Sequence, residues 1–188
     1  STQMAVVLGS ILGDGCLCAN WSKTNYRLKI SHSIKQSEYL LWKYDILKSL
    51  ILSKPSVYDK TKSITIRTIS HSELSILRNI FYKKNKKIIP KNIEVYIRDP
   101  LIVAIWFMDD GNIRKTKRVV EGYNLNTQSF TLKENKFIAD EFMRLYGISM
   151  TIHNNNGYPR LYIQKKSISV FRNLIEPYML ESMKYKLG

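Results

Sequence analysis

The feature that most limits how this chain can fold is a pair of apolar segments that each end in an Asp-Gly step. Residues 6–12 run without a charge into Gly13-Asp14-Gly15, and residues 101–108 run without a charge into Asp109-Asp110-Gly111. Apolar stretches of this kind predict helices that are buried on all sides, and glycine is a common stop at a helix C-terminus. We therefore expect two buried helices that each end beside an aspartate.

The surrounding sequence repeats at nearly the same interval. Asp14 and Asp110 lie 96 positions apart, and residues 75–80 (SILRNI) echo residues 169–174 (SVFRNL). This period is too long for a solenoid unit and predicts a duplication, with two similar halves related by approximate twofold symmetry. The expected divisions are an N-terminal half over 1–88, a connector over 89–100 and a C-terminal half over 101–188.

Hydrophobic periodicity predicts an α/β (α+β) fold. In the first half, helices are expected over 38–52 and 73–82, and strands over 27–31 and 63–67 with a partner near Val57. In the second half, a strand is expected over 124–128, and a capping box at Thr131-Leu132-Lys133-Glu134 predicts a helix that ends near Gly147. A hairpin is expected from 148–152 and 160–164, with a last helix over 167–176.

The charge of the chain indicates its class of partner. The sequence has 188 residues, 44% of them hydrophobic, and a formal net charge of +15, which is typical of a globular protein that binds a polyanion. The basic residues follow strand-like segments and loops rather than one amphipathic helix, which favours nucleic acid over a membrane surface. No apolar run approaches about 18 residues, so no membrane span is expected.

The cysteines and histidines do not suggest a metal site. Cys16 and Cys18 are two positions apart, which suits neither a zinc knuckle nor a disulfide framework, so we expect strand residues in a reducing compartment. His32, His71 and His153 show no spacing suited to a metal or to a histidine-centred nuclease. We expect them to be strand, cap or loop residues.

The two helix ends have a chemical meaning if the buried helices pack against each other at the twofold axis. Small residues on each helix, including Gly9, Gly13 and Ala104, would permit close approach. That packing would bring Asp14 and Asp110 together, with helix-end carbonyls, as a site for a hard divalent cation such as Mg²⁺. The alternative is that Asp-Gly only stops each helix, but two such steps at matching places favour the paired site.

At this point the motifs resemble those of a known family. Residues 7–15 (VLGSILGDG) and 103–111 (VAIWFMDDG) look like the two copies of the LAGLIDADG motif, and the chain resembles single-chain, two-motif LAGLIDADG homing endonucleases over residues 6–187. Within that family it is most similar to a mitochondrial intron-encoded member from yeast. The resemblance implies two pseudo-twofold αββαββα halves, whose antiparallel sheets form a saddle over the major groove of double-stranded DNA.

The resemblance also implies a set of site residues. Asp14 and Asp110 occupy the acidic, metal-binding catalytic position of the motif, and the backbone carbonyls of Gly13 and Asp109 are further candidate ligands. Lys87 and Lys186 match the basic residue that assists at the active site, although Lys86 or Lys184 could take these positions. The expected cofactor is Mg²⁺, with Mn²⁺ as a substitute and Ca²⁺ supporting binding without cleavage. The second motif departs from the pattern because Ile105 and Trp106 are bulky.

Strand parity predicts which residues contact DNA. Those that face away from the core of each half are Arg27, Lys29, Ser31, Thr65, Arg67, Asn124, Asn126, Gln128, Arg160, Tyr162 and Gln164. Arginine, asparagine and glutamine suit guanine and adenine edges, whereas lysine and serine more often hold phosphates. The alternative is that these residues are only the solvated faces of two sheets. Because the halves differ at most of these positions, a long asymmetric target is expected.

The predicted function is site-specific, Mg²⁺-dependent double-strand cleavage of DNA by a monomeric enzyme. Two alternatives stay open: a maturase that binds group I intron RNA on the same fold, and a DNA-binding protein without catalysis. The abundance of Lys, Asn, Ile and Tyr, together with the resemblance, predicts a mitochondrial gene. Because the chain begins with Ser1, we expect it to be a fragment or processed form of a longer reading frame.

Overall fold

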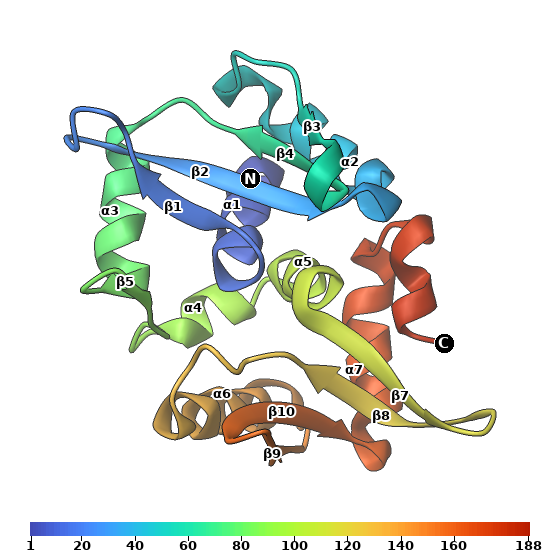
Figure 1. The fold of residues 1–188 in the computed structure, drawn as a ribbon. Helices are drawn as coiled ribbons and strands as arrows, with labels where there is room; N and C mark the ends of the chain where they lie inside the picture. The colour runs from blue at the N-terminus through green and yellow to red at the C-terminus, as the bar shows by residue number, and fades with distance from the viewer. The chain divides into compact units, whose positions relative to one another are not determined.

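A computed structural model describes residues 1–188, with the side chain of Asn155 excepted. The chain divides into two compact units, Ser1–Tyr82 and Lys83–Gly188. Each unit has its own four-stranded antiparallel sheet (Figure 1). None of the described helices is both long and apolar enough to cross a membrane.

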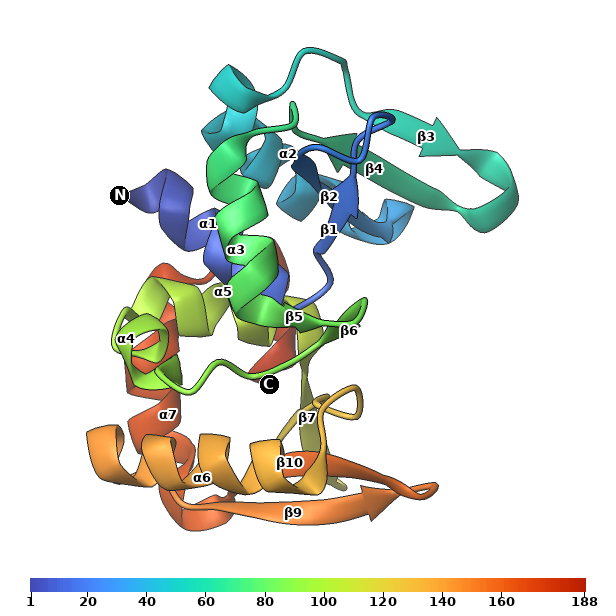
Figure 2. The same ribbon diagram turned by 90° about the vertical axis from the view of Figure 1, so that its left-hand side faces the viewer.

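The first unit follows the order αββαββα. Its elements are α1 (Thr2–Leu12), β1 (Cys16–Ala19), β2 (Tyr26–Ser33), α2 (Ser37–Leu47), β3 (Ser56–Tyr58), β4 (Ser63–Arg67) and α3 (Ser72–Phe81). The strand order is β1-β2-β4-β3. Helices α2 and α3 pack against β2 (Figure 2). The apolar residues that alternate along the two central strands are buried, as the sequence predicts: Leu28, Ile30, Ile64 and Ile66.

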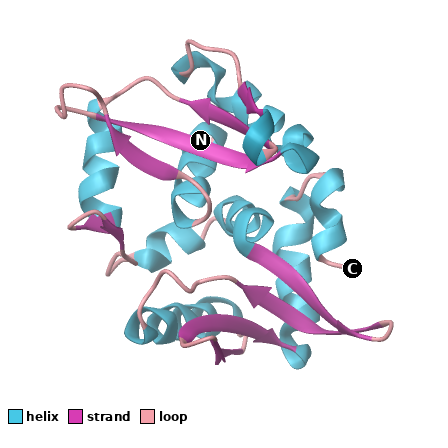
Figure 3. Cartoon of the chain, in the orientation of Figure 1, coloured by secondary structure: helices cyan, strands magenta, loops and turns pink.

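The second unit repeats this order. Its elements are α5 (Pro100–Asp110), β7 (Gly111–Thr116), β8 (Val119–Leu125), α6 (Leu132–Tyr146), β9 (Met150–Asn155), β10 (Tyr158–Gln164) and α7 (Ile168–Ile175), followed by a 3-10 helix, η6 (Glu181–Lys186). The strand order β7-β8-β10-β9 matches the order in the first unit position by position, and helices lie beside the strands of each sheet (Figure 3). The predicted mixed fold with duplicated αββαββα halves is therefore confirmed in the topology of each unit.

Local sequence explains where the main helices begin and end. The side chain of Asp99 accepts a hydrogen bond from the backbone N–H of Leu101 at the start of α5, where Pro100 occupies the first turn. The predicted capping box opens α6, since Thr131 and Glu134 bond each other's backbone, and Gly147 ends that helix with φ +65. The cap therefore confirms the predicted start of α6.

Two predicted elements differ from the structure. The helix expected over 38–52 ends at Leu47 and continues as a 3-10 turn, because the Leu50 carbonyl accepts from the backbone N–H of Ile69 at 2.7 Å instead of extending the helix. The strand expected over 124–128 ends at Leu125. Beyond it, the Thr127 hydroxyl donates to the side chain of Asn135 on α6, which turns the chain away from the sheet.

The predicted connector, together with the residues just before it, contains short regular elements. A two-stranded pair, β5 (Tyr82–Lys83) and β6 (Lys86–Lys87), is followed by α4 (Ile93–Ile97). Ile93 and Ile97 are fully buried, so α4 contributes to the apolar core of the second unit. The Tyr146 hydroxyl on α6 donates to the Ile97 carbonyl at 2.7 Å and holds the end of α4.

Candidate active site

Asp14 lies in a tight backbone turn directly after α1. The Gly13 N–H bonds the Gly9 carbonyl at 3.0 Å, and the Gly15 N–H bonds the Ser10 carbonyl at 2.6 Å. A Cβ atom on Gly15 would lie only 2.6 Å from that Ser10 oxygen, so the turn requires glycine. The predicted Asp-Gly stop is therefore present, and it holds a carboxylate that is 41% exposed.

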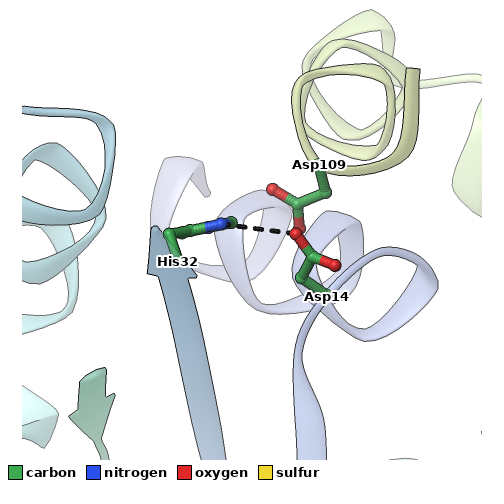
Figure 4. A group of neighbouring side chains, drawn as sticks. All are labelled: Asp14, His32 and Asp109. Atoms are coloured by element: carbon green, nitrogen blue, oxygen red, sulfur yellow. Dashed lines mark ion pairs between the residues drawn. The ribbon is translucent and has the colours of Figure 1, made fainter. Parts of the chain in front are cut away.

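His32 on β2 contacts the Asp14 carboxylate, a contact that the sequence did not predict. His32 Nδ1 lies 3.3 Å from Asp14 Oδ2, and the imidazole side chain is only 1% exposed (Figure 4). His32 does lie in a strand, as expected. The signal in the sequence is its parity, because His32 falls on the buried, apolar face of β2 with Leu28 and Ile30. A polar residue on such a face needs a partner.

In the second unit, Asp109 and Asp110 form the last turn of α5 and both are half-buried. The Asp110 carbonyl accepts from the backbone N–H of Asn126 at 3.0 Å. Lys186 donates its Nζ to the carbonyls of Met108 and Asp109, the latter at 3.1 Å, and is 8% exposed. An ammonium at this position complements the negative C-terminal end of the helix.

Three of the predicted site residues, Lys186, Asp109 and Lys87, can now be placed in the structure. Lys186 reaches the helix that carries Asp110, but its printed partners are carbonyl oxygens rather than a carboxylate. The Asp109 carbonyl, a candidate metal ligand, therefore already accepts a hydrogen bond. Lys87 lies half-buried in β6. His71, as expected, is a cap residue: its Nδ1 accepts from the backbone N–H of Glu73 at the start of α3.

In the first unit, the predicted DNA-contacting residues form one basic strip. Strand pairing sets Lys29 beside Arg67, and Arg27 beside Cys18, so both cysteines lie in β1 as expected. Ser31 and Thr65 are paired as well, with their hydroxyl oxygens 2.7 Å apart. Thr65 is only 3% exposed, so of this group it has the least surface available to a ligand.

An exposed tyrosine extends this strip. Arg67 donates to the Tyr58 hydroxyl at 3.1 Å. The hydrogen bond and the positive charge of Arg67 lower the pKa of Tyr58. Tyr58 could not be predicted from the sequence because β3 is too short to show strand periodicity. This contact fixes the guanidinium of Arg67 beside a second polar group.

In the second unit, the corresponding face is built around Tyr162. Its ring stacks on His153 with centroids 4.6 Å apart, and the Arg114 guanidinium lies 5.4 Å from the ring centroid. Burial lowers the pKa of His153, and the charges of Arg114 and Arg160 lower it further. Arg114 was missed because the strand β7 was not predicted.

The other predicted contacts in this unit differ in exposure. Gln164 is half-buried and accepts from the Ser149 hydroxyl at 2.6 Å. Asn124 is only 4% exposed. Asn126 and Gln128 lie beyond the end of β8, so the strand parity used to select them does not apply there. Asn126 donates to the side chain of Asn112 at 3.2 Å.

Comparison with known protein families identifies the family of this chain. Residues 4–171 match the profile of the family described as "LAGLIDADG DNA endonuclease family". The chain belongs to this family. The expectation drawn from the two LAGLIDADG motifs is therefore confirmed.

Curated relatives agree with this assignment. The chain is 29% identical to "Probable intron-encoded endonuclease 1" of Wickerhamomyces canadensis, across 98% of this chain and 83% of that protein. It is 27% identical to "Cytochrome b mRNA maturase bI2" of Debaryomyces hansenii, across 99% of this chain and 73% of that protein. Relatives with both kinds of name therefore match nearly the whole chain.

Solved LAGLIDADG structures share the fold. The homing endonuclease I-WcaI, bound to its DNA recognition sequence, matches with a TM-score of 0.89 and 26% identity, across 100% of this chain and 86% of that one. I-DmoI in complex with DNA and Mn matches with a TM-score of 0.60 and 18% identity, across 95% and 98% of the two chains. The second likeness concerns the fold alone.

Proposed function

We propose that this chain is a site-specific DNA endonuclease that makes a double-strand break in a long, asymmetric target. The observation that carries the proposal is that both LAGLIDADG motifs keep an aspartate, Asp14 and Asp110, at the end of an apolar helix. Membership of an endonuclease family, similarity to DNA-bound I-WcaI and the net charge of +15 support it. A protein that only binds DNA would not need both carboxylates.

The chemistry of the donors fits a hard divalent cation. The carboxylate of Asp14 is partly exposed, so it can exchange water for a metal ion without a large desolvation cost. We propose that Asp14 and Asp110 hold Mg²⁺, that Mn²⁺ substitutes for it, and that Ca²⁺ supports binding without cleavage. A bound Mg²⁺ would activate a water molecule and stabilise the leaving oxygen of the phosphodiester.

The basic residues have separate proposed roles. Lys186 fixes the last turn of α5 through the carbonyls of Met108 and Asp109 and brings a positive charge close to Asp110. That charge would stabilise negative charge developing on the phosphate. Lys87 is proposed to assist in the same way.

For target recognition we propose that both sheets read the major groove. In the first unit, Arg27, Lys29 and Arg67 form one basic strip, in which the arginines suit guanine edges and the lysine suits a phosphate. In the second unit, Arg160, Tyr162 and Gln164 lie on β10 and replace this strip by a less basic surface. The two half-sites of the target would then differ in sequence.

The test begins with a library of random DNA duplexes. Sequences that bind the wild-type chain in Ca²⁺ are selected, and cutting is then measured in Mg²⁺. We expect at least one bound sequence to be cut in both strands. Binding without any cutting would leave a DNA-binding protein and contradict the endonuclease proposal.

The matched variants Asp14→Asn and Asp110→Asn keep the size of each side chain and remove one charge. We expect each to lose at least about 100-fold in the cleavage rate, because each would lose a metal ligand, while DNA binding stays within a small factor of wild type. Gel assays of cutting and fluorescence anisotropy of binding measure the two effects separately. Cutting retained by either variant would remove that aspartate from its assigned role.

A second function has specific support, because a relative that matches 99% of the chain is named a cytochrome b mRNA maturase. An RNA-binding splicing helper would use the same basic residues of the two sheets. The discriminating measurement is splicing of the intron that encodes the chain, with and without the purified protein. Splicing stimulated equally by wild type and Asp14→Asn would indicate a maturase, since that activity does not need metal-dependent cleavage of DNA.

We also propose a mitochondrial gene and a monomeric protein. The intron-encoded and cytochrome b maturase names of the yeast relatives, with the Lys-, Asn-, Ile- and Tyr-rich composition, support the first. The presence of both motif copies in one chain supports the second, because a second copy is not needed to supply the other aspartate. Light scattering of the DNA complex would measure its stoichiometry.

A further inference from the structure

We propose that His32 is a positioning residue for Asp14: its Nδ1–H donates to the carboxylate, and Lys43 holds the opposite side of the imidazole ring. The inference rests on the proposed role of Asp14 in metal binding. It concerns only contacts within the first unit.

Three polar side chains form a continuous path from the core of this unit to Asp14. Lys43 Nζ on α2 lies 3.3 Å from His32 Nε2, and His32 Nδ1 lies 3.3 Å from Asp14 Oδ2. Lys43 is 0% exposed and His32 is 4% exposed. The imidazole therefore lies between a buried lysine and the carboxylate at the end of α1.

The donor inventory of these groups fixes the imidazole tautomer. A carboxylate has acceptors and no donor, so Nδ1 must donate in the contact with Asp14. The proton of a neutral imidazole is then on Nδ1, where it can be donated to the Asp14 carboxylate. His32 consequently acts on Asp14, in the way that a group behind a metal ligand sets the orientation of that ligand.

The surroundings of Lys43 support a specific role for it. Burying an ammonium is costly unless the charge is stabilised by nearby groups. The Tyr39 ring lies 4.4 Å from Lys43 Nζ and contributes a cation–π interaction, and its centroid is 5.1 Å from that of His32. Tyr39 is itself 0% exposed, so the ring holds both groups from one side.

This arrangement belongs to the first unit alone. When the two halves are aligned through the strand pairs Cys16–Lys29 and Asn112–Asn124, His32 corresponds to Thr127, a buried residue whose hydroxyl donates to Asn135 instead. In the second unit, the end of the motif helix is held by Lys186 on backbone carbonyls. A change at His32 should therefore act through Asp14 and not through Asp110.

The first experiment reads the tautomer directly in the full metal-free chain. Nitrogen-15 NMR with labelled histidine distinguishes a protonated Nδ1 from a protonated Nε2, and His32→Asn assigns the signal. We expect the Nδ1–H form in the wild type and a loss of this preference in Asp14→Ala, which removes the acceptor. A wild-type Nε2–H tautomer, or an unchanged signal in Asp14→Ala, would overturn the assignment.

The second experiment compares two amides at position 32. Asparagine carries its N–H₂ the same number of bonds from the backbone as Nδ1, whereas glutamine carries it at the distance of Nε2. Both variants are polar and similar in size, so a general packing defect would affect them alike. Ca²⁺ is titrated by calorimetry into the protein bound to its selected DNA. We expect His32→Asn to stay close to wild type and His32→Gln to lose about 10-fold or more in Ca²⁺ affinity.

A double-mutant cycle identifies the aspartate involved. His32→Gln should cause no further loss of Ca²⁺ affinity in an Asp14→Asn background and its full loss in an Asp110→Asn background. His71→Ala, which removes the cap of α3, is the matched control and should leave Ca²⁺ affinity unchanged. Equal effects of His32→Asn and His32→Gln, or equal losses in both aspartate backgrounds, would overturn the proposal.

The outcomes for the two proposals are separable. If the wild-type chain cuts no selected DNA in Mg²⁺, the endonuclease proposal fails, while the NMR tautomer and the Ca²⁺ titration still decide the role of His32. If the wild-type chain cuts and His32→Gln cuts with the same Mg²⁺ dependence, the positioning role fails and the endonuclease proposal stands.

Discussion

Gly15 and Gly111 each directly follow a proposed catalytic aspartate, and both are required by close contacts. A Cβ on Gly15 would lie 2.6 Å from the Ser10 carbonyl oxygen, and one on Gly111 would lie 2.4 Å from the Phe107 carbonyl oxygen. Backbone atoms cannot move away as a flexible side chain can. At both positions the glycine thus fixes where the aspartate lies relative to its helix end.

We therefore predict that Gly15→Ala strongly lowers the rate of DNA cleavage and only slightly lowers the stability of the fold. The new methyl would displace the Gly13–Gly15 turn, and a shift of about 1 Å at a reacting group can cost roughly 100-fold in rate. Single-turnover cutting and DNA affinity would be measured together. Gly147→Ala is the control, because it strains a positive φ in open space at the end of α6. Similar cutting by the two variants would contradict the prediction.

At the scale of elements, the sequence predicted the helices and strands whose patterns are set by residues close together in the chain. The apolar segment before Asp14, the capping box at Thr131 and the alternation in β4 each depend on neighbouring residues. The end of β8 depends instead on the bond between Thr127 and Asn135 on α6, and α4 is too short to show periodicity. The contact between His32 and Lys43 requires α2 to pack on β2, which no spacing in the sequence reveals.

Glu134 links two elements, so its protonation should affect stability. Burial alone would raise the pKa of Glu134, but hydrogen bonds from Thr131 and Ile89, with the charge of Lys86, leave it below its ordinary value of 4.5. The Ile89 N–H donates at 2.8 Å, so this carboxylate caps α6 and also holds the chain before α4. A carboxylate with a lowered pKa stabilises the fold above its unfolded pKa, and this contribution is lost as the pH falls through the folded value.

We predict that Glu134→Gln lowers the free energy of unfolding by ~1 kcal/mol near neutral pH, the usual size of a cap contribution. The difference from wild type should shrink as the pH falls below 4.5, where the wild-type carboxylate becomes protonated. Urea unfolding at several pH values measures it. Glu141→Gln, which removes an i,i+3 pair with Arg144 on the same helix, is the control. A difference that stays constant down to acid pH would refute the linkage.

At the scale of the whole molecule, duplication was readable because two halves of one sequence carry the same order of elements. The matching strand orders β1-β2-β4-β3 and β7-β8-β10-β9 agree with it. The residues that distinguish the halves were less predictable. Parity selected Thr65 and Asn124 as ligand-facing, yet they are only 3% and 4% exposed.

The net charge of +15 should make DNA binding strongly dependent on salt, since each phosphate neutralised by a basic residue releases counterions. Lys29 lies beside Arg67 across β2 and β4, in the basic strip of the first unit. We predict that Lys29→Gln weakens binding to all DNA sequences by a similar factor and lowers the slope of log affinity against log salt by about 1.

Arg67→Gln should instead relax the preference for particular bases, because a guanidinium reads guanine edges. Anisotropy titrations of matched and scrambled duplexes over a series of salt concentrations measure both effects. An unchanged slope in Lys29→Gln would show that this lysine does not contact a phosphate.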